Sequence, residues 1–340
     1  MGKYFGTDGI RGVANTELTA DLAYRTGFAL GCQLYGDLQR KPRVLIGRDT
    51  RISGTMLEAA LTAGLCAAGS DVVSLGVLPT PAVARATVSD DKADAGIVIS
   101  ASHNPYEHNG IKIFGGTGYK LTDAQEAATE AAIDAPPAEQ TKTFGDIGRL
   151  LPCTVDPVTD YCNFVVSTVP AGLSGMRVLV DCANGSASAT AKEIFAKLGA
   201  QADFLSCDPD GVNINVDCGS THLGALQRGV VEGGYPVGVA FDGDADRCLV
   251  VDETGAVIDG DHLIGILAAD MKQKGTLKNG AVGTILSNLG LHSYLKERGI
   301  SIATSNVGDR YVLEKNARRG SQHRRRAVRS RDFGRLRHHR

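Results

Sequence analysis

The chain has 340 residues, of which 43% are hydrophobic and 22% are charged, a composition typical of a folded, water-soluble protein with room for two or three domains. No apolar run approaches the roughly 20 residues that a membrane-spanning helix needs, and the N-terminus lacks the apolar core of a secretory signal. The eight cysteines form no C-x-x-C pair. We therefore expect a cytoplasmic protein with reduced thiols and no membrane partner.

The formal net charge of −2 conceals a strongly basic C-terminal segment. Residues 316–340 contain ten arginines, no lysine and one acidic residue, whereas the other 315 residues contain 26 basic and 37 acidic residues. An arginine-rich segment can bind nucleic acid, so a nucleic-acid-binding protein is one alternative. The segment has no periodicity, and Phe333 is its one aromatic residue, so we expect no nucleic-acid partner.

The first part of the chain begins with a glycine-rich loop and continues with alternating strand and helix patterns. Arg11 lies in that loop, where backbone N–H groups and a guanidinium can face a phosphate. Short apolar runs predict strands, and an alanine- and leucine-rich stretch that stops at Gly69 predicts a helix. The predicted elements are a strand at 44–47, a helix at 56–68, and strands at 71–75 and 96–99. This alternation predicts a mostly parallel sheet flanked by helices.

A serine-containing loop follows the strand at 96–99 directly. It contains Ser102 and His103, and Lys112 comes shortly after it. Ligands of α/β sheets gather outside the carboxyl ends of strands, so Ser102 is a candidate nucleophile or phosphate carrier. An ordinary Ser/Asn/Pro turn is the alternative.

The sequence of a helix end, a glycine and a strand occurs three times. Gly69, Gly199 and Gly299 occupy the glycine position, at spacings of 130 and 100 residues. This repeat predicts three related α/β domains, although α/β proteins in general share such patterns. We expect these domains at residues 1–150, 151–252 and 253–315, followed by the basic segment 316–340.

An acidic loop lies between strand patterns at 237–241 and 248–251. Its carboxylates, Asp242, Asp244 and Asp246, are two residues apart and can face one side of the backbone. Such a group of hard oxygen donors favours Mg²⁺ or Ca²⁺, and an acidic turn without metal is the alternative. An EF-hand is disfavoured because Arg247 stands where that loop requires glycine.

Together these motifs resemble the α-D-phosphohexomutase superfamily. The segments 3–15, 209–215 and 218–222 are similar to its phosphoglucosamine mutase branch. The resemblance extends from residue 2 to about Lys315. It implies repeated α/β domains with mostly parallel or mixed sheets flanked by helices, corresponding to domains I, II and most of III, with domain IV absent.

The resemblance also implies roles for individual residues. Ser102 would be the phosphoserine, and its phosphate oxygen would bind Mg²⁺ together with Asp242, Asp244 and Asp246. Arg247 would lie beside that site, and Arg11, His103 and Lys112 would contact the transferring phosphate or assist proton transfer.

The implied reaction converts glucosamine 6-phosphate to glucosamine 1-phosphate through a bisphosphate, on the route to bacterial cell-wall amino sugars. Two alternatives remain open. One is a phosphomannomutase or phosphoglucomutase, and the other is a non-catalytic fragment that binds metal and phosphosugar.

The C-terminal segment departs from the family pattern. The family's third-domain loop, Gly-Glu-x-Ser-Gly-His, does not occur in the sequence, so we expect little turnover. Codons can nevertheless be chosen for residues 324–340 that encode Gly-Gly-Glu-Gln-Ser-Gly-His when read one base later, and AAT GCG for Asn316-Ala317 then yields Met. We hypothesise a single-base insertion, either a true mutation or a sequencing error, that makes residues 316–340 an out-of-frame, disordered segment.

Overall fold

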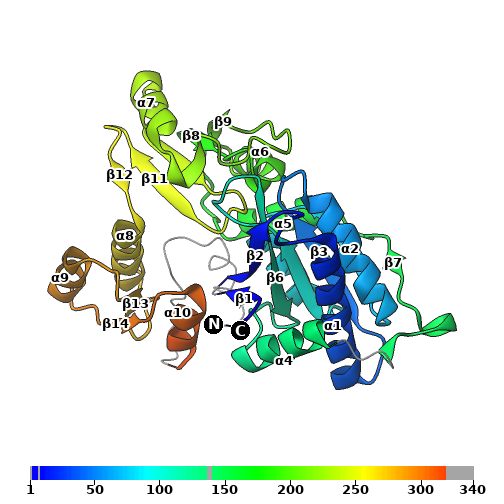
Figure 1. Ribbon diagram of the computed structural model, residues 1–340. Coiled ribbons are helices and arrows are strands. Elements are labelled where there is room, and N and C mark those ends of the chain that lie inside the picture. The colour runs from blue at the N-terminus through cyan, green and yellow to red at the C-terminus, as the bar shows by residue number, and fades with distance from the viewer. Residues whose placement is uncertain (1, 7, 136–139, 319–340) are drawn as a thin grey trace.

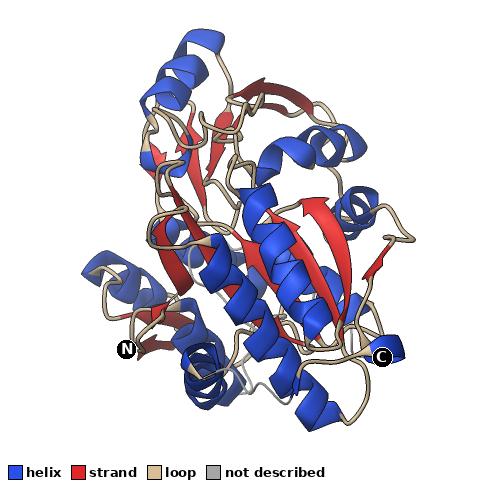
Figure 2. Ribbon diagram, turned by 45° about the vertical axis from the view of Figure 1, so that its right-hand side comes forward, coloured by secondary structure: helices blue, strands red, loops and turns tan. Residues whose placement is uncertain are grey.

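The computed structural model describes residues 2–6, 8–135 and 140–318, which form three α/β units in chain order (Figure 1). The first unit contains a seven-stranded sheet, the second a five-stranded sheet and the third a two-stranded sheet. Figure 2 shows helices lying across the face of the largest sheet. Helices on mixed sheets in repeated units confirm the predicted fold class.

The first unit is a sheet with the strand order β1-β2-β6-β5-β3-β4-β7. Its side chains alternate between two cores, as strand geometry requires. Val44 and Ile46 face the core beneath α1, α2 and α4, while Leu45 faces the core beneath α3 and α5. The strands are β1 (Phe5–Gly6), β2 (Gly9–Val13), β3 (Arg43–Arg48), β4 (Asp71–Val77), β5 (Ala95–Ile99), β6 (His108–Gly115) and β7 (Leu150–Leu151), and the helices are α1 (Ala20–Leu38), α2 (Gly54–Ala67), α3 (Thr80–Ser89), α4 (Asp123–Asp134) and the short η2 (Phe144–Asp146). Helix α5 (Pro157–Ser167) follows β7 and packs against both α3 of this unit and α6 of the second unit.

The second unit has the strand order β12-β11-β10-β8-β9. The second unit extends past the domain boundary expected at residue 252. Strand β12 lies beyond that residue, and it pairs with β11 in an antiparallel hairpin of the same sheet. The strands are β8 (Arg177–Asp181), β9 (Gln201–Leu205), β10 (Val237–Phe241), β11 (Cys248–Asp252) and β12 (Val257–Ile258), and the helices are α6 (Ala191–Lys197), α7 (Gly224–Gly233) and the short η3 (Ser186–Ala189) and η4 (Gly219–Thr221).

The third unit consists of a two-stranded parallel sheet and three helices. We expected a disordered segment from residue 316 onward. The structure differs at its start, since Asn316, Ala317 and Arg318 belong to the last helix, α10. Val312 and Asn316, one turn apart on α10, are both fully buried. Residues 319–340 lie outside the described residues. The elements are α8 (Gly260–Gln273), β13 (Ala281–Thr284), α9 (Leu289–Glu297), β14 (Ile302–Ser305) and α10 (Asp309–Arg318).

The predicted repeat is present in all three units. Gly69, Gly199 and Gly299 adopt φ values of 91°, 77° and 60°, a left-handed conformation that glycine reaches without strain. Each glycine leads into a strand that pairs in parallel with the strand before it, giving the pairs β3–β4, β8–β9 and β13–β14. The three units are therefore variations on one strand–helix–strand pattern.

Two of the antiparallel strand pairs follow connections that are too short to cross over. Residues 100–107 join β5 to β6, and residues 242–247 join β10 to β11. A parallel connection needs about a dozen residues or more, so β6 and β11 return antiparallel to their predecessors. These two short connections are the loops that carry Ser102 and the three aspartates predicted to bind a metal.

Candidate active site at the junction of the first two units

The serine loop, residues 100–107, holds Ser102 in a buried and constrained position. The Ser102 side chain is 1% exposed, and its backbone has a left-handed φ of 59°. The Ser102 carbonyl accepts hydrogen bonds from Arg51 Nη2 at 3.2 Å and from Asn215 Nδ2 at 2.9 Å. The fold thus maintains an unfavourable serine conformation with donors from two units.

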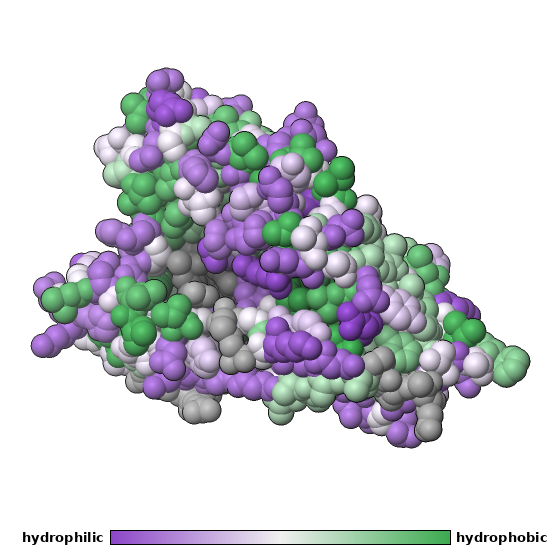
Figure 3. Space-filling model, viewed as in Figure 1, coloured by the Kyte–Doolittle hydropathy of each residue, from purple (hydrophilic) through white to green (hydrophobic). Residues whose placement is uncertain are grey.

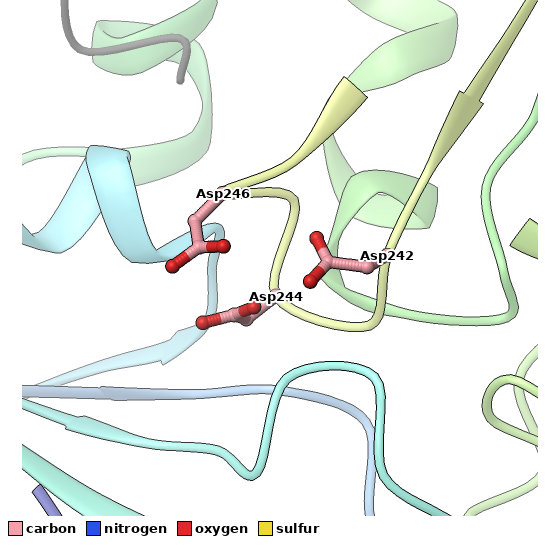
Figure 4. A group of neighbouring side chains, drawn as sticks. All are labelled: Asp242, Asp244 and Asp246. Carbon is pink, nitrogen blue, oxygen red and sulfur yellow. The ribbon is translucent and has the colours of Figure 1, made fainter. Parts of the chain in front are cut away.

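The acidic loop, residues 242–247, brings three carboxylates together. One oxygen from each of Asp242, Asp244 and Asp246 lies within 4.8 Å of the others, and Figure 4 shows the side chains converging from a single loop. All three side chains are buried. This group, the acidic triad, is the one such cluster found among the described residues.

The acidic triad has the properties of a cation site. Burial, followed by the charges of Asp244 and Asp246, raises the pKa of Asp242 to about 8, because three carboxylates cannot all remain charged in so small a volume without compensation. Among the described residues, Oδ1 of Asp244 has no hydrogen-bond partner. Hard oxygen donors with an unsatisfied buried atom fit a divalent cation.

The two loops are in direct contact. The Ser102 hydroxyl donates to Asp242 Oδ2 at 2.6 Å. A Cβ added to Gly243 would lie 2.5 Å from the Ser102 carbonyl oxygen, so only glycine allows the two backbones to approach this closely. The serine and the acidic triad therefore form one site, although 140 residues separate Ser102 from Asp242.

Lys112 is the buried cation of the site. It lies on β6, it is 1% exposed, and its Nζ is 2.6 Å from Asp244 Oδ2, 3.3 Å from Asp8 Oδ2 and 3.6 Å from Asp246 Oδ2. Burial acts to lower the pKa of Lys112, but the carboxylates of Asp244, Asp246 and Asp8 outweigh it and the pKa is raised. Lys112 is therefore charged at neutral pH.

The remaining sequence-predicted residues surround this centre. His103 Nδ1 lies 3.5 Å from Ser102 Oγ, and burial, with help from Arg247 and Arg11, lowers the pKa of His103. Arg11 on β2 forms an ion pair with Asp8. The Arg247 side chain is 42% exposed, and its Nε lies 3.9 Å from Asp242 Oδ2 and 3.9 Å from Asp246 Oδ1. The structure thus places every predicted site residue around Ser102 and the acidic triad.

Several residues that support the site were not singled out from the sequence. Arg51 is fully buried, pairs with Asp49, and also donates to the Asn104 carbonyl. Thr80, at the start of α3, donates its backbone N–H to the Asp244 carbonyl at 2.9 Å and its hydroxyl to the Asp244 carboxylate. The available signal was the position of Asp49 and Arg51 directly after the buried strand β3.

The described residues contain no helix with both the length and the apolar character needed to cross a membrane. The arginine-rich part of the C-terminal segment begins at residue 318 and lies almost entirely outside the described residues, so its predicted lack of a nucleic-acid role stays a prediction.

Comparison with family models finds three successive matches. The models describe the α/β/α domains I, II and III of phosphoglucomutase/phosphomannomutase, and they match residues 2–140, 159–255 and 259–322. The third match ends seven residues after Lys315.

Curated proteins and solved structures agree with these matches. The chain is 52% identical over 316 residues to a phosphoglucosamine mutase of Acetivibrio thermocellus, covering 92% of this chain and 70% of the relative. It is also 52% identical over 316 residues to a phosphoglucosamine mutase of Rhodococcus erythropolis, covering 71% of that relative. A phosphoglucomutase/phosphomannomutase family protein from Burkholderia thailandensis superposes with a TM-score of 0.82 at 25% identity, over 96% of this chain and 74% of that one. From these matches and the shared three-unit fold, the chain belongs to the phosphoglucomutase/phosphomannomutase family.

Proposed function

We propose that this chain is a phosphoglucosamine mutase that interconverts glucosamine 6-phosphate and glucosamine 1-phosphate. The observation that carries the proposal is the 2.6 Å contact between Ser102 Oγ and Asp242 Oδ2 at the edge of the acidic triad. A buried serine beside a cation site is suited to carrying a phosphoryl group. The names of the curated relatives support an amino sugar as the substrate.

The proposed reaction begins with phosphorylated Ser102 and glucosamine 6-phosphate. The bond between phosphorus and Ser102 Oγ breaks, a bond between phosphorus and the sugar O1 forms, and the hydroxyl proton passes to Oγ. The product is glucosamine 1,6-bisphosphate. The bisphosphate then reorients and returns its 6-phosphoryl group to Ser102 by the reverse chemistry, which leaves glucosamine 1-phosphate and no net change in the enzyme.

The charges of the site support these steps. Lys112 is positively charged at neutral pH and offers a fixed charge to the phosphoryl oxygens. His103 is neutral because its pKa is lowered, and its position 3.5 Å from Ser102 Oγ allows it to take the sugar hydroxyl proton and pass it to Oγ. Arg11 and Arg247 contribute planar guanidinium groups that match phosphate geometry.

Mg²⁺ is the cation that we propose for the acidic triad, because hard carboxylate and phosphate oxygens are its preferred ligands. Asp242, Asp244, Asp246 and an oxygen of phosphorylated Ser102 would hold it. When bound, it supplies positive charge that offsets the charge of the transferring phosphoryl group.

The proposed setting is the cytoplasm, which the free state of all eight cysteines supports. Because the chain spans about 70% of its relatives' length, we assign it the phosphoryl exchange at Ser102 and expect slow complete interconversion. We propose a phosphosugar partner and no nucleic-acid partner. A salt-dependent DNA mobility shift by the full chain would contradict the latter.

Intact-mass measurement tests the central step. The chain is incubated with Mg²⁺ and glucosamine 1,6-bisphosphate, and we expect one phosphate to be added to the parent chain and none to Ser102→Ala. Ser89→Ala, at an exposed serine of α3, is the matched control and should be phosphorylated like the parent. Phosphorylation of Ser102→Ala would overturn the assignment. Faster reaction with mannose or glucose 1,6-bisphosphate would instead favour a phosphomannomutase or phosphoglucomutase, and absence of phosphorylation would favour a non-catalytic binding fragment.

A further inference from the structure

Asp8 is a carboxylate shared by three cations next to the active site. Its Oδ2 contacts Arg11 and lies 3.3 Å from Lys112, while its Oδ1 contacts Lys120. Arg11 and Lys112 are the groups that would face the phosphoryl group. Lys120 binds the other oxygen of the same carboxylate.

Lys120 also reaches the third unit. Its Nζ lies 3.3 Å from Oδ1 of Asp309, the first residue of α10. The backbone of Lys120 is fixed to the first unit by a bridge to Phe114 of β6. A single ammonium group therefore joins a residue next to the active site to a helix of another unit.

The ion pair between Lys120 and Asp309 is largely shielded from solvent. The side chains of Lys120 and Asp309 are 12% and 9% exposed, so their attraction is screened less than that of a surface ion pair. The charges alternate along the path from Asp244 through Lys112, Asp8 and Lys120 to Asp309. Movement of α10 away from the first unit would remove one of the two carboxylates that Lys120 contacts.

We propose that Lys120 is a positioning residue that holds Asp8 between Arg11 and Lys112 and couples this arrangement to the position of α10. Without Lys120, Oδ1 of Asp8 can also bind Arg11 or Lys112, and Asp8 competes more strongly with the phosphoryl group for both of them. Phosphoryl transfer then slows, while the acidic triad is unchanged. The link between the units is independent of the proposed function, whereas the effect on phosphoryl transfer rests on it.

Hydrogen exchange of the full chain tests the link. In Lys120→Met we expect the amides of α10 to exchange on the order of tenfold faster than in the parent, because one partly buried tie to the first unit is lost. Lys274→Met is the matched control, since Lys274 pairs with Asp270 at the C-terminal end of α8, within the third unit. Lys120→Arg should retain parental exchange, and Asp309→Asn should show the same acceleration from the other side of the contact. Equal exchange of α10 in Lys120→Met and Lys274→Met would overturn the link.

The rate of Ser102 phosphorylation by glucosamine 1,6-bisphosphate tests the positioning role. We expect Lys120→Met to be roughly tenfold slower, with recovery in Lys120→Arg and with unchanged Mg²⁺ affinity by calorimetry, a combination that loss of folding would not produce. A parental rate in Lys120→Met would overturn the positioning role. If the parent itself is not phosphorylated, the proposed function fails, and the hydrogen-exchange result still decides the link.

Discussion

At the scale of single residues, the site depends on a serine in an unfavourable conformation. The left-handed φ of 59° at Ser102 places strain of roughly 1–2 kcal/mol on any residue with a Cβ. The donors on Arg51 and Asn215 hold the Ser102 carbonyl in this geometry. The serine hydroxyl is thereby held against Asp242.

Two substitutions at Ser102 separate strain from chemistry. Ser102→Gly and Ser102→Ala both remove the hydroxyl, so both should lose phosphorylation. Ser102→Gly should be more stable than Ser102→Ala by about 1 kcal/mol, because only glycine relieves the left-handed backbone. Urea denaturation of the two variants measures the difference, and equal stability would show that the backbone is not strained.

The protonation of Asp242 couples cation binding to pH. Its pKa is raised to about 8, so without metal its contribution to stability is complete below its ordinary pKa of about 4 and is lost as the pH rises through about 8. A cation displaces the bound proton, so stabilisation by Mg²⁺ should grow over the same range, to about 3 kcal/mol at a hundredfold excess over the dissociation constant.

Melting curves with and without Mg²⁺ between about pH 6 and pH 9 check this coupling. The rise in melting temperature produced by Mg²⁺ should increase with pH in the parent. It should be strongly reduced in Asp244→Asn and retained in Asp91→Asn, a control at an exposed aspartate. A rise that does not depend on pH would contradict the proton displacement.

Site residues could be predicted from the sequence where several of them stand together in one short loop after a strand. Ser102 with His103, and the three aspartates of the acidic triad, each stand directly after a buried strand. The contacts that Arg51 and Asn215 make with the Ser102 carbonyl could not be predicted, because 51 and 113 residues of sequence separate the partners. Their role depends on how the units pack, which no local pattern records.

At the scale of elements, the repeated helix–glycine–strand connection was predictable because it depends on local backbone chemistry. The βαβ rhythm did not predict the direction of every strand, since β6 and β11 return antiparallel where that rhythm favours a mostly parallel sheet. The deciding quantity is loop length, eight residues after β5 and six after β10, which is too short for a crossover. These same short loops carry Ser102 and the acidic triad.

Substitution of glycine by alanine should raise the stability of the chain at a position inside a helix and lower it at a left-handed position after a helix. Gly199→Ala should lower stability by about 1 kcal/mol, because φ is 77° there while the new Cβ would meet only ordinary contacts at 3.6 Å or more. Gly69→Ala should lose more, since its Cβ would lie 3.1 Å from the Asp146 carbonyl oxygen.

Gly36→Ala, in an exposed turn of α1 with open space around it, should instead raise stability by roughly 0.5–1 kcal/mol. Chemical denaturation of the three variants measures the series. A loss at Gly36, or no loss at Gly199, would contradict the assignment of left-handed caps.

At the scale of the whole molecule, the site lies where the units meet, with Ser102 and Lys112 from the first, the acidic triad from the second, and Asp309 of the third joined through Lys120. The third unit carries exposed large apolar side chains. Ile285, Leu286 and Leu289 are 65%, 74% and 80% exposed, and Figure 3 shows hydrophobic side chains on its surface. The family model for domain III matches this unit from residue 259 to residue 322.

Asn316 is the clearest mismatch between sequence and fold in that unit. Its side chain is fully buried on the face of α10 that carries Val312, and within the described part of the chain neither its Nδ2 nor its Oδ1 has a hydrogen-bond partner. Burying such an amide unsatisfied costs about 1–3 kcal/mol. A frameshift would account for this, because residue 316 becomes Met, an apolar residue, when AAT GCG is read one base later.

Asn316→Leu should therefore stabilise the chain by about 1–3 kcal/mol, since leucine has nearly the shape of asparagine and leaves no buried polar atom unpaired. Asn306→Leu, at an exposed asparagine of the same unit, is the control and should give no such gain. Differential scanning calorimetry of both variants measures the effect, and sequencing the gene across the codons for Lys315 and Asn316 tests its proposed origin. A stabilised Asn316→Leu with shifted-frame codons that encode the family motif would support an inserted base. A destabilised Asn316→Leu would show that the fold requires the amide, and codons that give no family sequence in the shifted frame would exclude the frameshift.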